Sequence, residues 1–331
     1  MTHFWQNKQV LVTGAGGFIG SHLVETLARE GAQVRALVRY NSRGDWGLLK
    51  LLPPELLAQV EVAAGDLREL STIKAAMEGV SHVFHLGALI AIPYSYVHPA
   101  EVVETNVIGT LNVLLAGREL GTKRIVHTST SEVYGTARQV PINESHPLQG
   151  QSPYSASKIG ADKIAESFFL SYNLPVVTLR PFNTYGPRQS TRAVIPTIIT
   201  QALTQEVVRL GNLEARRDLT YVSDTVAGFL KAAATPGIEG ETVNLGVGAE
   251  ITIGELAEKI IRLVGRPVQI EIDAARLRPE KSEVQRLLSD NARAKEIMGW
   301  EPQVSFEEGL GRTIAWVREH LGLYRSGEYQ L

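Results

Sequence analysis

The first half of the chain alternates short apolar runs with longer stretches whose apolar residues recur at helical spacing. Short apolar runs between polar residues predict buried strands, and the amphipathic stretches predict helices. We expect strands at 10–12, 34–38, 60–63, 83–86, 125–127 and 176–179, and helices at 21–30, 70–77, 101–120 and 154–172. This alternation predicts an α/β fold with a doubly wound parallel sheet, whose ligands lie beyond the carboxyl ends of the strands.

The pattern changes after about Pro187, where prolines and glycines interrupt the segments. We expect most of this part to form a smaller C-terminal substrate domain. Residues 218–234 have the pattern of a strand and a helix that return to the large sheet. The predicted domains are therefore discontinuous, with 1–187 plus about 218–245 in the larger one and about 188–217 plus 246–331 in the smaller one.

Composition narrows the class of protein. The chain has 331 residues, 44% hydrophobic residues, a formal net charge of -2 and no cysteine. A near-neutral chain lacks the basic face that a nucleic-acid partner would require. No apolar run is long enough to span a bilayer, and the polar start, Met1–Gln9, does not resemble a signal peptide. We expect a cytoplasmic protein without a nucleic-acid or membrane partner.

A glycine-rich turn follows the first expected strand and opens the first helix. Its glycines, Gly14, Gly17 and Gly20, have the spacing G-x-x-G-x-x-G, with Phe18 and Ile19 between the last two. Glycines allow backbone amides to approach a phosphate closely, and the helix N-terminus favours negative charge. The turn predicts a pyrophosphate site for NAD(H) or NADP(H) in a Rossmann domain, with an ordinary strand–helix turn as the alternative.

The end of the second expected strand indicates which dinucleotide binds. An acidic residue there would bind a ribose 2′-hydroxyl, whereas an arginine would pair with a 2′-phosphate. The chain has Arg39 and Arg43 and no acid, with Asn41 and Ser42 between them. We therefore favour NADP(H) and keep NAD(H) as the alternative, and the alternative for the arginines is that they are only solvated.

Further cofactor contacts are expected after the third and fourth strands. Asp66 and Leu67 follow the third strand, and Leu86 and Ala88 lie at the end of the fourth. Asp66 could accept a hydrogen bond from the adenine amine. The alternative is that Asp66 caps the helix that follows.

Two groups of residues carry candidate chemistry. Tyr154 and Lys158 share a helix face at i and i+4. An ammonium lowers the pKa of a nearby phenol from about 10, so that the pair could remove a proton from an alcohol. The second group is Thr130, Ser131 and Glu132, just past the expected strand at 125–127. Read separately, the first group could be a solvated pair and the second a polar turn.

Taken together, these motifs resemble the extended short-chain dehydrogenase/reductase family. The resemblance covers nearly the whole chain and rests on the glycine turn, Thr130–Glu132, Tyr154-x-x-x-Lys158, 180–188 and 217–224. Within that family, Thr-Ser-Glu resembles the GDP-mannose 4,6-dehydratase type. The LegB-like 4,6-dehydratases of legionaminic acid synthesis are more similar still, on the segments 40–47, 88–96 and 278–284.

The resemblance implies a role for each candidate catalytic residue. Tyr154 would deprotonate the sugar 4-hydroxyl, which Thr130 orients, while the C4 hydride passes to the nicotinamide. Glu132 would then take the C5 proton and help water to leave C6, with Ser131 in support. Hydride return to C6 would give a 4-keto-6-deoxy sugar. The dTDP-glucose dehydratase pattern has Asp where this chain has Ser131, so Glu132 would serve both proton transfers.

The resemblance also implies partners. The substrate would be a nucleotide-diphosphate sugar, foremost an N-acetylglucosamine, bound by Ser95, Asn183, Arg217 and Arg278. Helices 101–120 and 154–172 would form a homodimer, although their apolar faces could equally be internal core. Arg192 and Arg216 are interpreted as solvated charges. The histidines show no metal-ligand spacing, so we expect no metal.

Other functions remain open. An NDP-sugar 4-epimerase is one, and a UDP-glucuronate decarboxylase is another because some of those relatives carry Thr-Ser-Glu. Decarboxylation requires a cation for a C6 carboxylate, and the sequence indicates no arginine beside Tyr154. A non-catalytic dinucleotide sensor is the distant alternative, because a fold alone does not imply activity.

Overall fold

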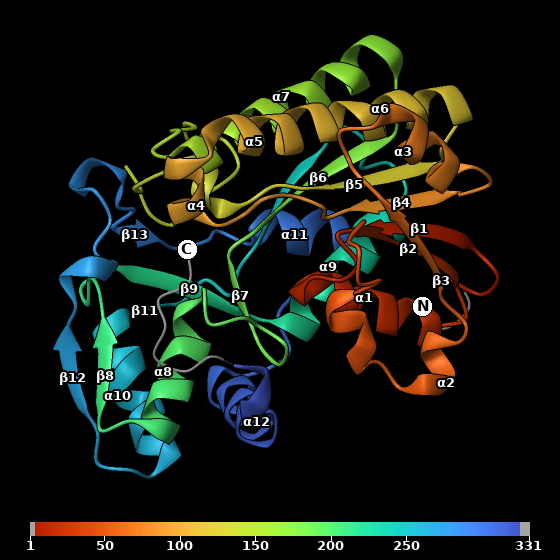
Figure 1. The fold of residues 1–331 in the computed structure, drawn as a ribbon. Helices are drawn as coiled ribbons and strands as arrows, with labels where there is room; N and C mark the ends of the chain where they lie inside the picture. The colour runs from red at the N-terminus through yellow and green to blue at the C-terminus, as the bar shows by residue number, and fades with distance from the viewer. Residues whose placement is uncertain (1–3, 325–331) are drawn as a thin grey trace.

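A seven-stranded parallel sheet forms the centre of the molecule (Figure 1). The computed structural model describes residues 4–324, so the ends of the two expected domains, 1–3 and 325–331, lie outside the described residues. The strand order is β10-β6-β5-β4-β1-β2-β3. These strands are β1 (Gln9–Thr13), β2 (Gln33–Arg39), β3 (Glu61–Gly65), β4 (His82–His85), β5 (Arg124–Thr128), β6 (Val176–Pro181) and β10 (Thr242–Leu245).

Helices cover both faces of this sheet (Figure 1). One face carries α3 (Leu70–Met77), α5 (Pro99–Val103), α6 (Gly109–Leu120) and α7 (Pro153–Tyr172). The other face carries α1 (Phe18–Arg29), α9 (Val222–Ala234) and α11 (Ala292–Met298). Alternate residues of a strand point to opposite faces. Accordingly, Val10 and Val12 belong to the hydrophobic cluster on one side, and Leu11 belongs to the cluster on the other.

The sheet order reverses between β1 and β4, because β2 and β3 lie on one side of β1 and β4, β5 and β6 on the other. A crevice for ligands opens at such a reversal, beyond the carboxyl ends of the strands. The expected doubly wound Rossmann sheet is thus present. Short elements join it at its edges, namely η1 (Gly47–Leu51), α2 (Pro54–Leu57), α4 (Ile92–Val97) and η3 (Ser131–Tyr134).

A smaller region lies beside the carboxyl edge of the large sheet. It contains two small sheets, in which β9 pairs with β7, β11 and β13, and β8 pairs with β12. Helices α8, α10 and α12 pack together against them (Figure 1). Its elements are β7 (Asn183–Tyr185), α8 (Val194–Thr204), β8 (Val207–Leu210), β9 (Arg216–Tyr221), β11 (Glu250–Thr252), α10 (Ile253–Val264), β12 (Gln269–Ile272), η4 (Ala274–Arg276), η5 (Glu280–Ser282), β13 (Arg286–Leu287), α12 (Phe306–Glu319) and η6 (Leu321–Leu323).

The structure corrects one expectation about the large sheet. The strand expected near residue 218 is β9, and it belongs to the small sheet rather than the large one. The helix that follows it, α9, does return to the large sheet and packs on β5 and β6. The strand that joins the large sheet is β10, which pairs with β6. The chain therefore crosses between the two regions after Tyr221 and again after β10.

The expected helix 101–120 is helical throughout but not uniformly α-helical. It begins at Pro99 as α5, passes through a π-helical turn, η2 (Glu104–Ile108), and continues as α6. Such turns are frequent at functional sites. The buried Asn106 in this turn bonds the Leu89 backbone and the Ser157 hydroxyl at 2.8 to 3.0 Å, which joins the turn to α7. No helix within residues 4–324 is long and apolar enough to cross a lipid bilayer.

Candidate active site

The turn after β1 approaches neighbouring backbone too closely for side chains. Gly14 has a φ of +67°, which favours glycine, and a Cβ there would lie 2.8 Å from the amide nitrogen of Gly87. A Cβ on Gly20 would collide with the Gly14 carbonyl oxygen. Glycine at 14 and 20 therefore allows the strand, the turn and the helix to pack together.

Helix α1 begins directly after this turn with its amides available. Its N-cap is Gly17, and no side chain caps the helix there. The N-terminus of a helix carries partial positive charge and amides that favour a phosphate. A pyrophosphate therefore fits this cradle, with Phe18 and Ile19 lining the adjoining cavity.

Arg39 lies at the end of β2, and its guanidinium faces an acidic side chain. Its Nη2 is 3.4 Å from Oε1 of Glu101 on α5, and Tyr94 donates a hydrogen bond to the same carboxylate. The Arg39 side chain is 65% exposed, so this ion pair is weak and could yield to a ligand phosphate.

The loop after β2 is organised by Asn41. Its Oδ1 accepts from the amides of Arg43 at 3.2 Å and Asp45 at 2.9 Å, and its Nδ2 donates to the Asp45 carbonyl. The amide of Leu48 donates to Gly16, which closes the loop over the glycine turn. Asn41 and Ser42 line the cavity, but the Asn41 side chain is engaged in shaping this loop.

Asp66 and Leu67 follow β3 but do not line the main cavity. The Asp66 carboxylate is held by Arg68, whose Nη2 lies 2.7 Å away. The N-cap of α3 is Glu69, so the alternative that Asp66 caps this helix is wrong. Leu67 packs closely under Gly87, where an added Cβ would lie 2.7 Å from its Cδ1.

Thr130, Ser131 and Glu132 lie past the carboxyl end of β5, where Ser131–Tyr134 forms a single 3₁₀ turn. The Thr130 hydroxyl oxygen accepts from the Glu132 amide at 3.2 Å and thereby caps this turn. Ser131 is buried, while Thr130 and Glu132 are half-buried. The turn presents two hydroxyls and one carboxylate to the cavity.

Tyr154 lies in the first turn of α7, which a capping box of Ser152 and Ser155 starts. Burial raises the pKa of the Tyr154 phenol above its usual range, while a hydrogen bond with Thr130 acts in the opposite direction. Burial lowers the pKa of Lys158 to about 8, and the charge of Asp162 opposes that shift. Lys158 is buried one helical turn after Tyr154 and does not itself line the cavity.

The expected substrate residues come mostly from the smaller region. Asn183 on β7 has a buried Oδ1 without a hydrogen-bond partner among residues 4–324. Arg217 on β9 and Arg278 both face Glu283, at 3.4 and 3.8 Å respectively. Ser95 is fully buried and donates to the Ile92 carbonyl at 2.7 Å, so that it is turned away from the cavity.

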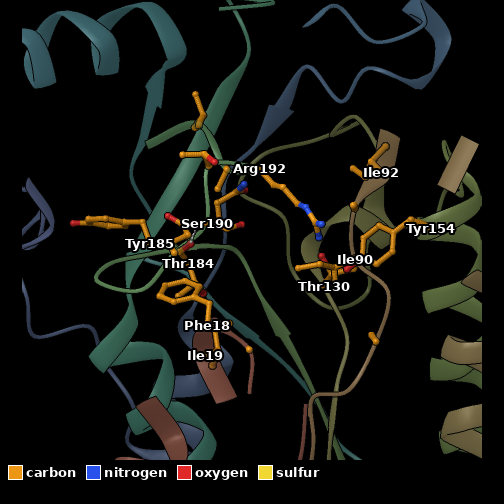
Figure 2. Close-up of a pocket in the computed structure, with 18 of the residues that line it drawn as sticks. Phe18, Ile19, Ile90, Ile92, Thr130, Tyr154, Thr184, Tyr185, Ser190 and Arg192 are labelled. Atoms are coloured by element: carbon orange, nitrogen blue, oxygen red, sulfur yellow. Dashed lines mark hydrogen bonds between the residues drawn. The ribbon is translucent and has the colours of Figure 1, made fainter. Parts of the chain in front are cut away.

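One cavity of about 1160 Å³ connects these groups. In Figure 2, Ile90, Ile92, Thr130 and Tyr154 lie on one side of it and Thr184 and Ser190 on the other, with Phe18 and Ile19 below Thr184. The expected site residues that line it are Gly14, Gly17, Phe18, Ile19, Gly20, Arg39, Asn41, Ser42, Leu86, Ala88, Thr130, Ser131, Glu132, Tyr154, Asn183, Arg217 and Arg278. Those that do not are Asp66, Leu67, Ser95 and Lys158.

The interpretation of Arg192 as only a solvated charge missed its place in the site. Arg192 lies between β7 and α8, lines the cavity, and extends across it toward Thr130 and Tyr154 (Figure 2). The Arg192 side chain is exposed, and its guanidinium has no ion-pair partner among residues 4–324. Arg216, by contrast, lies outside the cavity and pairs with Glu250 at 3.8 Å. The only sequence signal for Arg192 was its position in a loop after a strand.

Two buried histidines make hydrogen bonds within the larger region. His85 bonds the hydroxyls of Thr13 and Thr110, and His127 bonds Asp162. Within residues 4–324, no group of three or more acidic or histidine side chains is arranged to hold a metal ion.

A Rossmann sheet with a phosphate cradle, a Tyr/Lys pair and a second region with paired arginines defines the class of protein. This is a dinucleotide-dependent enzyme of the extended short-chain dehydrogenase/reductase type. Comparison with known proteins places the chain within that class.

The family model of GDP-mannose 4,6 dehydratase matches residues 11–313. A dTDP-D-glucose 4,6-dehydratase of Mus musculus is 30% identical over 98% of this chain and 92% of its own length. A UDP-glucuronate 4-epimerase of Thermodesulfobacterium geofontis is 31% identical over 96% of this chain and 98% of its own. The crystal structure of DesIV, a dTDP-glucose 4,6-dehydratase from Streptomyces venezuelae with NAD bound, has a TM-score of 0.83, 31% identity and coverage of 96% and 99%.

This chain belongs to the GDP-mannose 4,6-dehydratase family, the nucleotide-sugar dehydratases and epimerases of the extended short-chain dehydrogenase/reductase fold. It is therefore an enzyme that uses a nicotinamide dinucleotide. The family contains both dehydratases and epimerases, so that the particular reaction depends on the residues of this site.

Proposed function

We propose that this enzyme is a nucleotide-sugar 4,6-dehydratase that converts an NDP-hexose, foremost NDP-N-acetylglucosamine, to the 4-keto-6-deoxy sugar. The observation that carries the proposal is Glu132, which lies beside Thr130 in the same cavity as Tyr154. Epimerisation at C4 needs one acid–base group at the 4-hydroxyl. Dehydration needs a second group for the C5 proton and the C6 hydroxyl, and Glu132 supplies it.

Tyr154 is the group that takes the proton of the sugar 4-hydroxyl. A bound nicotinamide would supply the acceptor for the C4 hydride and the donor that returns it at C6. Because Thr130 uses its oxygen lone pair for the Glu132 amide, its hydroxyl proton can be donated to the Tyr154 oxygen. By the family resemblance, Lys158, one helical turn after Tyr154, is assigned to favour the phenolate. The hydrogen bond with Thr130 opposes the effect of burial on the pKa of Tyr154.

Glu132 acts at the next two carbons. A 4-keto group acidifies the C5 hydrogen, so that a carboxylate can remove it. The same carboxyl group can then give the proton to the departing C6 hydroxyl, which leaves as water. When hydride returns at C6, C5 takes up a solvent-exchanged proton, which balances the one that Tyr154 takes from the 4-hydroxyl. Ser131 stands where the dTDP-glucose dehydratase pattern has an acid, so we assign both transfers to Glu132 with Ser131 as a hydrogen-bonding partner.

The diphosphate of the substrate is assigned to the arginines of the smaller region. Arg217 and Arg278 converge on Glu283 in the cavity, and guanidinium groups fit phosphate oxygens in pairs. Asn183 offers an amide whose buried oxygen has no described partner among residues 4–324. The resemblance of 40–47, 88–96 and 278–284 to the legionaminic acid enzymes supports an N-acetylated hexose.

For the cofactor we favour NADP(H). Arg39 and Arg43 flank the position after β2, where a 2′-phosphate would lie. Glu101 opposes this choice because it pairs with Arg39, and the bound NAD of DesIV makes NAD(H) the alternative. An exposed ion pair contributes at most about 1 kcal/mol, so a phosphate that forms two bonds with a guanidinium would displace it.

A uronate substrate is the second candidate, and Arg192 is the observation that favours it. Its guanidinium extends toward Thr130 and Tyr154, where the reacting end of the sugar would lie (Figure 2). An arginine there could pair with a C6 carboxylate. The enzyme would then be a 4-epimerase or a decarboxylase of a UDP-uronate. Replacing Arg192 by Met separates the two candidates, because it would abolish use of a uronate but leave an uncharged hexose reactive.

The proposed function is tested by product mass. The purified protein is incubated with UDP-N-acetylglucosamine, GDP-N-acetylglucosamine, GDP-mannose and UDP-glucuronate, each with NAD and with NADP. Loss of one water from a hexose supports the dehydratase. Loss of carbon dioxide from the uronate, or a product of unchanged mass, would overturn it in favour of a decarboxylase or an epimerase.

We also propose a homodimer through α5, α6 and α7, the layer farthest from the small region (Figure 1). Large apolar side chains are exposed on these helices and on the turn η2 between α5 and α6, namely Val103, Ile108, Leu120, Leu170 and Tyr172. Exposed apolar patches of this kind mark interaction surfaces. Analytical ultracentrifugation should show a dimer that Ile108→Asp dissociates, and a wild-type monomer at micromolar concentration would contradict the proposal.

A further inference from the structure

Asp162 is a buried carboxylate that the proposed reaction does not use. It lies on α7 one helical turn after Lys158 and two turns after Tyr154, which places the three side chains on one face of the helix. Its side chain is 4% exposed. A charge in such a place is costly unless it is paired and fully hydrogen-bonded.

The Asp162 carboxylate is satisfied from the strands beneath the helix. Its Oδ2 accepts from the Ser129 hydroxyl at 2.8 Å and from Nη2 of Arg180 at 3.0 Å. Its Oδ1 lies 3.1 Å from Nε2 of His127. Ser129 immediately precedes Thr130, so this carboxylate ties α7 to the strand end from which the Thr130–Glu132 turn begins.

The network continues to the edge of the sheet. Nη1 of Arg180 donates to the Tyr134 hydroxyl at 2.9 Å, and that hydroxyl donates to Asn244 on β10 at 2.8 Å. Tyr134 is the last residue of the 3₁₀ turn that holds Glu132. The buried ion pair between Asp162 and Arg180 therefore connects the helix that carries Tyr154 to the turn that carries Glu132.

The charges around Lys158 explain why an anion is needed there. The titratable groups that interact with it are Asp162 on α7, His85 on β4 and His127 on β5, with Arg180 of β6 beyond Asp162. Burial lowers the pKa of both histidines, so that neither is an anion or a cation at neutral pH. Burial lowers the pKa of Lys158 as well, to about 8, and Asp162 is the charge that opposes it.

We propose that Asp162 is a positioning residue that keeps Lys158 in its ammonium form and fixes α7 against the turn that carries Glu132. The inference rests on the proposed role of Tyr154 and Lys158 in proton transfer, whichever sugar is the substrate. A purely structural Asp162 would serve only as the counter-ion of Arg180. The two roles differ in what happens to Lys158 when the negative charge is removed.

The test is a titration of Lys158 in the ligand-free protein. Lysine labelled with ¹³C at Cε is followed by NMR against pH, and the Lys158 resonance is assigned by its absence from Lys158→Met. In Asp162→Asn, the midpoint should fall by about one pH unit, since a buried opposite charge one helical turn away is lost. The matched control is Glu166→Gln, an exposed acid on the same helix, which should leave the midpoint in place.

Two further measurements keep the test decisive if Asp162→Asn does not fold, and extend it to the enzymatic activity. If Asp162→Asn leaves Arg180 unpaired and unfolds the protein, Asp162→Asn/Arg180→Met removes both buried charges, and the Lys158 midpoint should still fall. With an accepted substrate, the alkaline limb of the kcat profile should move to lower pH by the same interval. A folded variant whose Lys158 midpoint is unchanged would overturn the inference. Because the NMR titration needs no substrate, this outcome is separate from a failure of the proposed dehydratase reaction.

Discussion

Thr130 and Tyr154 hydrogen-bond to each other, although one follows β5 and the other begins α7. The Thr130 oxygen is already an acceptor for the Glu132 amide at 3.2 Å. The Thr130 hydroxyl therefore positions the Glu132 carboxylate, through the Glu132 backbone amide. The same hydroxyl also hydrogen-bonds the Tyr154 phenol directly. Both proton-transfer groups of the proposed reaction, Glu132 and Tyr154, are thus held by Thr130.

Removing this hydroxyl should slow the reaction without removing the cofactor. In Thr130→Val, kcat should fall roughly ten- to hundredfold, because a hydrogen bond to a charged group contributes about 1.5–3 kcal/mol. Thr130→Ser is the matched control and should retain most of the rate. Steady-state kinetics measure both, and a valine variant with the wild-type kcat would exclude the role assigned to Thr130.

Glu132→Gln should stop water loss while dinucleotide binding persists. The amide keeps the shape of the side chain but cannot take the C5 proton, so kcat should fall by a factor of about 10²–10⁴ or more. In deuterated water, the wild-type product should carry deuterium at C5, and the variant should place none there. Cofactor affinity is measured separately by tryptophan fluorescence. Full activity of this variant would contradict the account of Glu132.

Cofactor choice should depend on Arg39 and on its partner. In Arg39→Ala, the Kd for NADPH should rise by about tenfold or more, because a charge-assisted contact to the 2′-phosphate is lost, while the Kd for NADH changes little. Glu101→Gln should strengthen NADPH binding by removing a like charge, with Glu104→Gln as the control. Calorimetry on the ligand-free protein measures these values. Wild-type protein that prefers NADH, with Arg39→Ala unchanged toward NADPH, would decide for NAD(H).

The substrate diphosphate should depend on Arg278. In Arg278→Ala, KM for the nucleotide sugar should rise by about tenfold or more with a smaller change in kcat, because the contact is made in the ground state as well as in the transition state. Lys281→Ala, an exposed cation in the same segment, is the control. An unchanged KM in the Arg278 variant would remove this residue from the diphosphate site.

Much of the larger region follows from local sequence pattern. The expected helix 70–77 coincides with α3, and each strand expected in the first 180 residues begins within one residue of an observed strand. These elements are determined by the spacing of apolar residues and by glycines at the ends of elements, both of which are local properties of the sequence. The glycine turn was predictable for the same reason, since its context of strand and helix is contiguous in sequence.

Other features depend on contacts between distant segments. β9 has the pattern of any half-buried strand, and only its pairing with β7, β11 and β13 assigns it to the small sheet. The π-helical turn at Asn106 is fixed by bonds to Leu89 and Ser157, far away in sequence. The direction of Arg192 depends on the path of a loop, and the partners of Asp162 come from separate strands. No local pattern reports these relationships.

The most direct test of the account is the fate of hydrogen during one turnover. A hexose substrate labelled with deuterium at C4 is converted in ordinary water, and the product is analysed by mass spectrometry and NMR. A 4,6-dehydratase should yield a 4-keto-6-deoxy sugar that has lost one water and carries the deuterium at C6. Deuterium that remains at C4 in a product of unchanged mass would contradict the account and identify an epimerase.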